Sequence, residues 1–253
     1  MAEPGDRAST SEPRSPWLSG GFVSAAAFIG FIAVIGTVLA VTSDNSAESA
    51  PTAQAPAVRS TGPQPSGSVA DGAPCPELSD ERQDLPASAP AGVTWSLYDS
   101  VALPSSKKAG PALAGKDVAR CYAHTPVGAL LATSQISVRY LAADDWLEVT
   151  RTQTVGAGRD AYITDRTKAE ATAVPDDDAG GGAHGQIAGF RFVTYNDTTA
   201  VVQTVWRFPD GRMQAATTTA LWQEGDWRLE YPADPADPAP VDSLAGYIEW
   251  GGV

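Results

Sequence analysis

The chain has 253 residues, of which 43% are hydrophobic, and its formal net charge is −13. This acidic balance argues against direct binding of nucleic acid, which depends on neutralising phosphates with Lys and Arg. Polar and apolar residues are unevenly distributed, so we expect four segments: a short cytoplasmic tail (1–16), a transmembrane helix (17–42), a disordered linker (43–91) and a folded domain (92–253).

The first apolar block predicts a membrane anchor. The run from Gly21 to Val41 carries no charge, and as a helix it would span roughly 31 Å, about the hydrocarbon thickness of a bilayer. Trp17 lies at its start, where an interfacial aromatic residue is expected. Arg7 and Arg14 precede the block, and the next basic residue is Arg59. The amino end is therefore predicted to be cytoplasmic and the folded domain to lie outside the cell membrane.

Two alternatives for this block stay open. It could be a cleaved signal peptide, with the small residues Ala47 and Ser49 at the cleavage site, although the apolar run exceeds the about 7–15 residues of a signal core. Small residues four apart could form the seam of a helix dimer, or could simply reflect a composition rich in Ala and Gly. The candidate packing residues are Ala26, Gly30, Gly36 and Ala40.

The linker, 43–91, is rich in Ser, Pro, Ala and Gly and has few large apolar side chains. Burial in such a segment cannot offset the entropy of ordering the chain. As a flexible coil it would have a root-mean-square span of roughly 40 Å. We therefore interpret it as a tether that holds the domain away from the membrane.

The first half of the domain predicts one strand and two helices. Apolar and polar residues alternate over 93–99, as in a half-buried strand. The segment 125–144 predicts a helix in which Thr125 is the N-cap and Pro126 the first helical residue, without a capping box because Gly128 occupies the third position. Residues 145–155 fit a helix or a strand, and 158–174 predict a second helix.

The last third of the chain alternates as strands do. We expect an antiparallel meander of four strands over 186–195, 198–208, 212–223 and 227–231, separated by turns rich in Asn, Asp, Gly and Pro. Helices followed by such a meander indicate an α+β domain. After a proline-rich passage, Leu244, Tyr247 and Ile248 could pack one helical turn against the domain.

The two cysteines allow three interpretations. In an exported protein an even, small cysteine count favours a disulfide, and a Cys75–Cys121 bridge would stabilise the fold by roughly 4 kcal/mol for a loop of this length. Cys121 could instead be a nucleophile with His124 as its base. A zinc site built from Cys75, Cys121, His124 and His184 has the required number of ligands, but its histidines are far apart in the sequence. We predict the disulfide.

Other candidate sites are weaker. The run Asp176–Asp178 lacks the spaced ligands of a calcium loop, and Gly156–Asp160 lacks the Lys-Ser/Thr pair of a phosphate-binding loop. The tryptophans Trp206, Trp222, Trp227 and Trp250 fit core packing better than a binding platform. We therefore expect no catalytic, cofactor-binding or metal-binding residue.

Several motifs carry a family resemblance over roughly Cys75 to Val253. The order of helices and meander, with LWQEGDWRLEY near its end, resembles the cone-shaped nuclear-transport-factor-two-like (cystatin-like) fold. Anchor, tether and domain together resemble the scaffold subunits of type IV secretion and conjugation machines, with the TcpC family nearest, although TcpC carries two such domains. The motifs GVTWSLYDSVALPSSKKAGP, ARCYAHTPVGALLA, GAGRD and AGFRFVTY resemble uncharacterised actinobacterial membrane proteins associated with conjugative elements.

The resemblance implies a non-catalytic scaffold in the cell membrane. Its expected partners are the lipid bilayer, other membrane or conjugation-machine subunits and further copies of itself, with no cofactor and no direct contact to nucleic acid. The alternative is a tethered small-ligand binder or enzyme, because cone-shaped folds often enclose an apolar pocket. Asp160, Tyr162 and Tyr195 would then converge on that pocket. Fold alone does not decide between these functions.

Overall fold

The computed structural model describes residues 74–172 and 185–252. The predicted transmembrane helix and tail, the linker up to residue 73, the candidate packing residues Ala26, Gly30, Gly36 and Ala40, and the loop residues Asp176–Asp178 and His184 lie outside this part of the chain. Within the two described ranges, no helix is both long and apolar enough to cross a bilayer.

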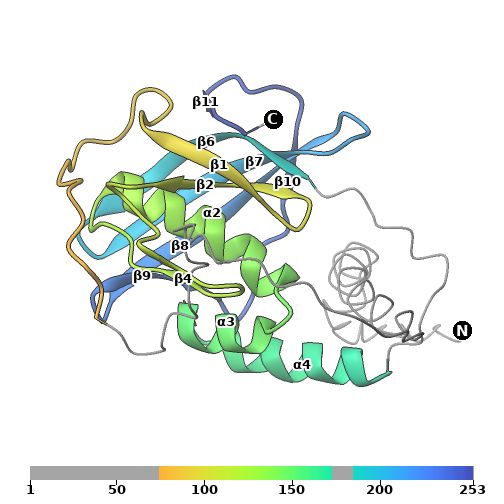
Figure 1. The fold of residues 1–253 in the computed structure, drawn as a ribbon. Coiled ribbons are helices and arrows are strands. Elements are labelled where there is room, and N and C mark those ends of the chain that lie inside the picture. Colours follow the sequence, from red (N-terminus) through yellow and green to blue (C-terminus); the bar gives the residue numbers. More distant parts are fainter. Residues whose placement is uncertain (1–73, 173–184, 253) are drawn as a thin grey trace, which may run out of the picture.

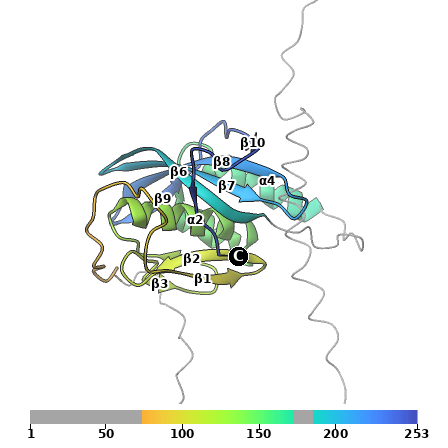
Figure 2. The ribbon, with the colours of Figure 1, turned by 90° about the horizontal axis from the view of Figure 1, so that it is seen from above.

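The described chain is a mixed α+β fold in three layers, as predicted at the level of fold class (Figures 1 and 2). A hairpin of β1 (Val93–Tyr98) and β2 (Val101–Ser106) covers one side of helix α2 (Pro126–Ala142), and the large sheet covers the other. The smaller elements are β3 (Leu113–Ala114), β4 (Ala119–Arg120), α3 (Trp146–Gln153), β5 (Thr154–Val155) and α4 (Arg159–Thr172). The middle layer is thus a helix enclosed between two sheets.

The large sheet is built on the predicted antiparallel meander. Its strands are β6 (Gln186–Asn196), β7 (Thr199–Arg207), β8 (Met213–Gln223) and β9 (Asp226–Glu230), flanked by β11 (Ile248–Glu249) on β6 and by the parallel strand β5 on β9, while β10 (Ala239–Val241) pairs with β8. Register shifts interrupt β6 after Ile187 and after Phe192. Such bulges bend a strand and increase its twist.

Helix α2 begins where the sequence predicts. The Thr125 hydroxyl accepts a hydrogen bond from the Gly128 amide at 3.1 Å, and Pro126 occupies the first turn. A Cβ atom added at Gly128 would overlap the carbonyl oxygen of Ala123, so only glycine fits at this position. The third helical position therefore has to be glycine for steric reasons, so no Glu or Gln side chain is available there to complete a capping box.

The interior between the layers is filled by large side chains. Leu103 of β2, Leu130 and Leu131 of α2, Phe190 of β6 and Trp227 of β9 are all less than 2% exposed. Because both faces of α2 are covered, its buried residues surround the helix instead of forming a single stripe. Most of the large aromatic side chains of the sheet therefore lie inside the fold.

Segment 74–91, which we assigned to the linker, packs against the domain without regular secondary structure. Asp80 is 8% exposed, and its carboxylate accepts a 2.9 Å hydrogen bond from the Thr125 hydroxyl. The side chain of Gln83 donates to the carbonyl of His124 and accepts from the Tyr195 hydroxyl. These hydrogen bonds show that the folded part of the chain begins before Gly92. Hydrophobic patterns in the sequence do not reveal this start, because the contacts are made by polar side chains.

The carboxyl-terminal segment differs from the sequence expectation. The helical turn predicted for Leu244, Tyr247 and Ile248 is instead a tight turn, closed by a 3.0 Å bond from the Tyr247 amide to the Leu244 carbonyl, followed by β11. Gly246 has φ +82°, a left-handed conformation that glycine adopts readily and that interrupts a helix. The ambiguous segment 145–155 contains both structures, helix α3 and strand β5.

Candidate functional site

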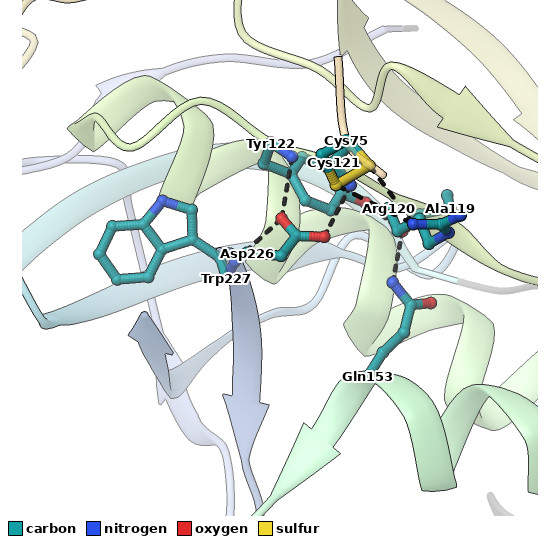
Figure 3. Close-up of a disulfide and its surroundings, with 8 residues drawn as sticks. All are labelled: Cys75, Ala119, Arg120, Cys121, Tyr122, Gln153, Asp226 and Trp227. Carbon is teal, nitrogen blue, oxygen red and sulfur yellow. Dashed lines mark hydrogen bonds between the residues drawn. A yellow bond between two sulfur atoms is a disulfide. The ribbon is translucent and has the colours of Figure 1, made fainter. Parts of the chain in front are cut away.

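The predicted disulfide is present. Cys75 and Cys121 are joined, with a Cα–Cα separation of 5.3 Å, and the chain has no free cysteine. The carboxylate of Asp226 and both sulfur atoms lie within 4.8 Å of one another (Figure 3). Because a thiolate is the form that binds metals and attacks substrates, the bonded sulfurs fit neither the zinc-site nor the nucleophile interpretation.

The Asp226 carboxylate fixes the chain beside the disulfide. It accepts hydrogen bonds from the backbone amides of Cys121 at 2.6 Å, Tyr122 at 2.9 Å and Trp227 at 2.9 Å (Figure 3). Burial raises the pKa of Asp226, and the three amide donors offset part of that rise. Cys121 has φ +70°, which a residue with a side chain adopts only where its surroundings hold it. Asp226 is therefore a structural acceptor.

Two neighbouring side chains complete this junction. The Arg120 guanidinium lies 3.6 Å from the Cys121 sulfur and 3.9 Å from the Cys75 sulfur. The amide of Gln153, at the end of α3, donates to the Ala119 carbonyl (Figure 3). The same carbonyl also accepts a 2.8 Å bond from the Tyr122 hydroxyl. We call the set formed by Cys75, Arg120, Cys121, Tyr122 and Asp226 the disulfide junction. It ties the beginning of the domain to β9.

His124 is part of a different group of contacts. Its ring stacks on Trp222 with a centroid distance of 4.0 Å and an angle of 9° between the planes. Its Nε2 atom pairs with the carbonyl oxygen of Asp197, in the turn between β6 and β7. These contacts hold the imidazole against the large sheet, so the structure supports packing for His124 and not the role of base for Cys121.

The residues proposed for an enclosed pocket do not meet. Asp160 is exposed at the start of α4 and pairs with Arg159. Tyr162 is buried, with its hydroxyl 3.0 Å from the Arg166 guanidinium, and burial raises the pKa of Tyr162. Tyr195 donates from β6 to Gln83 at 2.9 Å. Asp160 and Tyr162 lie on α4 and Tyr195 lies on β6, and each of the three side chains has its own set of neighbours.

The four tryptophans of the sequence analysis pack as expected. Trp227 is 1% exposed and donates through Nε1 to the Ala123 carbonyl at 3.0 Å. Trp206 and Trp222 are partly buried and pack on the same core. Trp250 is also buried, and its ring packs edge to face with that of Trp95, with a centroid distance of 4.8 Å. Because Trp95 is partly exposed, this contact lies near the surface of the molecule.

Trp95 and Trp250 line an open groove of about 680 Å³ between β1, the beginning of β6, the end of β7 and the carboxyl-terminal segment. Its aromatic and apolar wall includes Phe208 and Ile187, and the exposed charged residues Arg207 and Glu249 also line it. Sequence reasoning did not single out Trp95, although its alternation with Val93 and Leu97 in β1 was visible. We call this feature the Trp95–Trp250 groove.

Strand β1 forms one wall of the groove and has an unpaired side. Over the described residues it pairs with β2 alone, in an unbroken antiparallel register from Val93–Ser106 to Tyr98–Val101. Leu97, near its end, is 70% exposed, the largest exposure among the exposed large hydrophobic residues of the described chain. We call the unpaired side of β1, with Val93, Trp95 and Leu97, the β1 edge.

Comparison with known proteins identifies a family for the chain but no similar individual protein. No curated protein and no solved structure is significantly similar to the chain. The family model described as a domain of unknown function, DUF8175, matches residues 43–249, which is most of the chain and includes the predicted linker. The chain therefore belongs to the DUF8175 family.

Proposed function

We propose that this protein is a non-catalytic assembly subunit, anchored in the cell membrane, whose outer domain acts through protein–protein contacts. The observation that carries the proposal is a contrast within the described residues: large side chains pack the core, whereas the β1 edge beside the Trp95–Trp250 groove pairs with no other strand. An uncharged edge strand with an exposed apolar side chain is a surface on which another chain can add a strand.

The polar groups of the interior give less support to a catalytic function. An active site brings together a nucleophile or base with groups that orient it and stabilise charge. Here the half-buried Asp226 carboxylate holds three backbone amides, and the buried Arg166 guanidinium donates to the carbonyls of Tyr140 and Leu141. These groups stabilise turns and helix ends, which fits an assembly domain.

The proposed process comes from the family resemblance. We infer that the domain is a nuclear-transport-factor-two-like cone and that the subunit serves a conjugation or type IV secretion-like machine, with other membrane subunits and further copies of itself as partners. The curved meander packed on α2 is compatible with such a cone. The uncharged block at 17–42 supports the anchor, and the net charge of −13 supports partners other than nucleic acid.

The topology is tested first. Protease added to intact protoplasts should remove the domain beyond Asp44 and spare the first residues of the chain. A domain that stays protected would contradict the orientation, and a released form that begins near Ala50 would contradict the anchor.

The process is tested by purification and by deletion. The full-length protein, extracted from membranes with mild detergent, should bring down other membrane subunits, and deleting its gene should lower transfer of the mobile element. Normal transfer in the deletion strain, together with a protein that purifies alone, would remove the assembly proposal.

A small-ligand binder is the second candidate, because the groove volume of about 680 Å³ lies in the range of ligand sites, roughly 300–1,000 Å³. Native mass spectrometry of the purified full-length protein separates the two functions. A stoichiometric small molecule that Trp95→Ala removes, without loss of the fold, would favour the binder.

A further inference from the structure

We propose that the β1 edge pairs with β1 of a second copy of this chain, antiparallel and about a two-fold axis at Trp95. The inference rests on the proposed function, since it names the partner of one assembly surface. It follows from three features of β1: the direction of its backbone groups, the pattern of its side chains and its lack of charge.

Within residues 74–172 and 185–252, the backbone groups on one side of β1 have no partner, and they occur at regular positions. Trp95 lies opposite Pro104 of β2, and proline has no N–H to donate. That pair is therefore a non-hydrogen-bonded one, in which both residues direct their N–H and C=O groups away from each other. Val93 and Leu97, two positions away on either side, have the same orientation. An N–H and a C=O from each of these three residues thus face outward.

A second β1 strand matches these groups when Trp95 lies on the axis. Val93 of one copy then lies opposite Leu97 of the other, and Trp95 lies opposite Trp95. Each of these pairs can exchange two hydrogen bonds, as in the closely bonded positions of an antiparallel ladder. Every outward group of the β1 edge acquires a partner, and the two hairpins form one continuous sheet.

The side chains of β1 are complementary to themselves in the same register. Val93, Trp95 and Leu97 lie on one face of the strand, so Leu97, 70% exposed in a single copy, would be covered by Val93 of the second. On the opposite face Ser96 would lie opposite Thr94. Pairs of apolar or of hydroxyl side chains across strands stabilise a sheet.

Charge does not oppose this pairing locally. The chain as a whole has a net charge of −13, so two copies repel, but the strand VTWSLY carries no charged residue. Asp99, the first residue beyond it, would lie opposite the uncharged Ala91. Edge strands are normally protected by charges, prolines or bulges. The strand β1 has an unbroken register and none of these features.

The interface would be small and depends on the anchor. Strands of this length bury less than the about 1,600 Å² of a standard stable interface. Confinement to a membrane raises the effective concentration of the copies and favours a contact that is weak in dilute solution. We therefore expect the pairing in the full-length protein in membranes, and little of it for the isolated domain.

Two cysteine variants test the register. Thr94→Cys and Ser96→Cys, each in the full-length protein with a different tag, are produced together in membranes and oxidised. The two positions form a non-hydrogen-bonded pair in the proposed dimer, with Cα atoms about 4.5 Å apart, which a disulfide can span. Because Cys75 and Cys121 are already joined, no other thiol competes. The mixed dimer should be the main product, well above either homodimer.

A lysine at the edge provides the matched control. Leu97→Lys, added to both cysteine variants, should abolish the crosslink. Val193→Lys, at another exposed apolar position on β6 that is 57% exposed, should leave the crosslink intact. Equal yields of mixed and homodimers, no crosslink at all, or a crosslink to a different protein would each overturn the pairing. If other subunits still co-purify in that case, only this inference fails; if none does, the assembly proposal fails too.

Discussion

The disulfide junction and the β1 edge lie in the same domain but differ in the hydrogen bonding of their polar groups within the described chain. At the junction the Asp226 carboxylate binds three backbone amides, and the bridge joins segments 46 positions apart. Along the β1 edge a row of backbone groups has no partner in the described chain, and Leu97 remains exposed. The conspicuous Cys, His and Asp residues therefore build the structure, while an uncharged strand carries the surface that we propose for binding.

Removing the disulfide should have the largest effect. Cys121→Ser opens a loop of 46 positions, and we expect it to lower the free energy of unfolding by about 4 kcal/mol, measured by urea denaturation of the outer domain. His124→Ala is the control, because it removes a neighbouring ring without opening the loop. A large loss of stability in the control and a small one in Cys121→Ser would reverse the assignment.

The start of α2 should be nearly as sensitive. Gly128→Ala places a methyl group against the Ala123 carbonyl oxygen, and such overpacking should cost about 3 kcal/mol of stability. At Gly115 an added Cβ would lie 3.5 Å from the Val118 carbonyl oxygen, which is ordinary contact, so Gly115→Ala should be tolerated. Thermal unfolding of the two variants would show whether glycine is required only at the first site.

Asp226→Asn tests the carboxylate of the junction. The amide keeps one acceptor oxygen but turns an NH₂ group toward backbone donors, so we expect a loss of about 2 kcal/mol. Asp237→Asn, in the exposed proline-rich passage, should change stability by less than about 0.5 kcal/mol. Faster hydrogen exchange at the Cys121 and Tyr122 amides in the first variant would identify the cause; unchanged exchange would argue against it.

The smallest effect on folding is expected at the β1 edge. Leu97 is 70% exposed, so Leu97→Lys should change the free energy of unfolding by less than about 0.5 kcal/mol. The two variants Cys121→Ser and Leu97→Lys should thus separate stability from association. A Leu97→Lys domain that unfolds at markedly lower urea would show that the edge is structural.

Much of the local structure could be predicted from the sequence. The N-cap Thr125 and the following Pro126 specify the start of α2, and alternation with turn residues specifies the strands β6 to β9. These signals involve residues within a few positions of each other, so they survive in a single sequence. The disulfide could be predicted as well, because only two cysteines were available to pair.

The candidate site depended on contacts between distant parts of the chain. Asp226 binds amides 104 and 105 positions away, and Asp80 meets Thr125 across 45 positions. Periodicity indicates which residues face inward but not which of them meet, and it did not show that Trp95 would lie against Trp250. The sequence by itself determined the start of α2, the four strands of the meander and the bridge. Tertiary packing decided which polar groups are hydrogen-bonded inside the domain and which strand has an edge without a partner in the described chain, because that outcome depends on how the layers enclose α2.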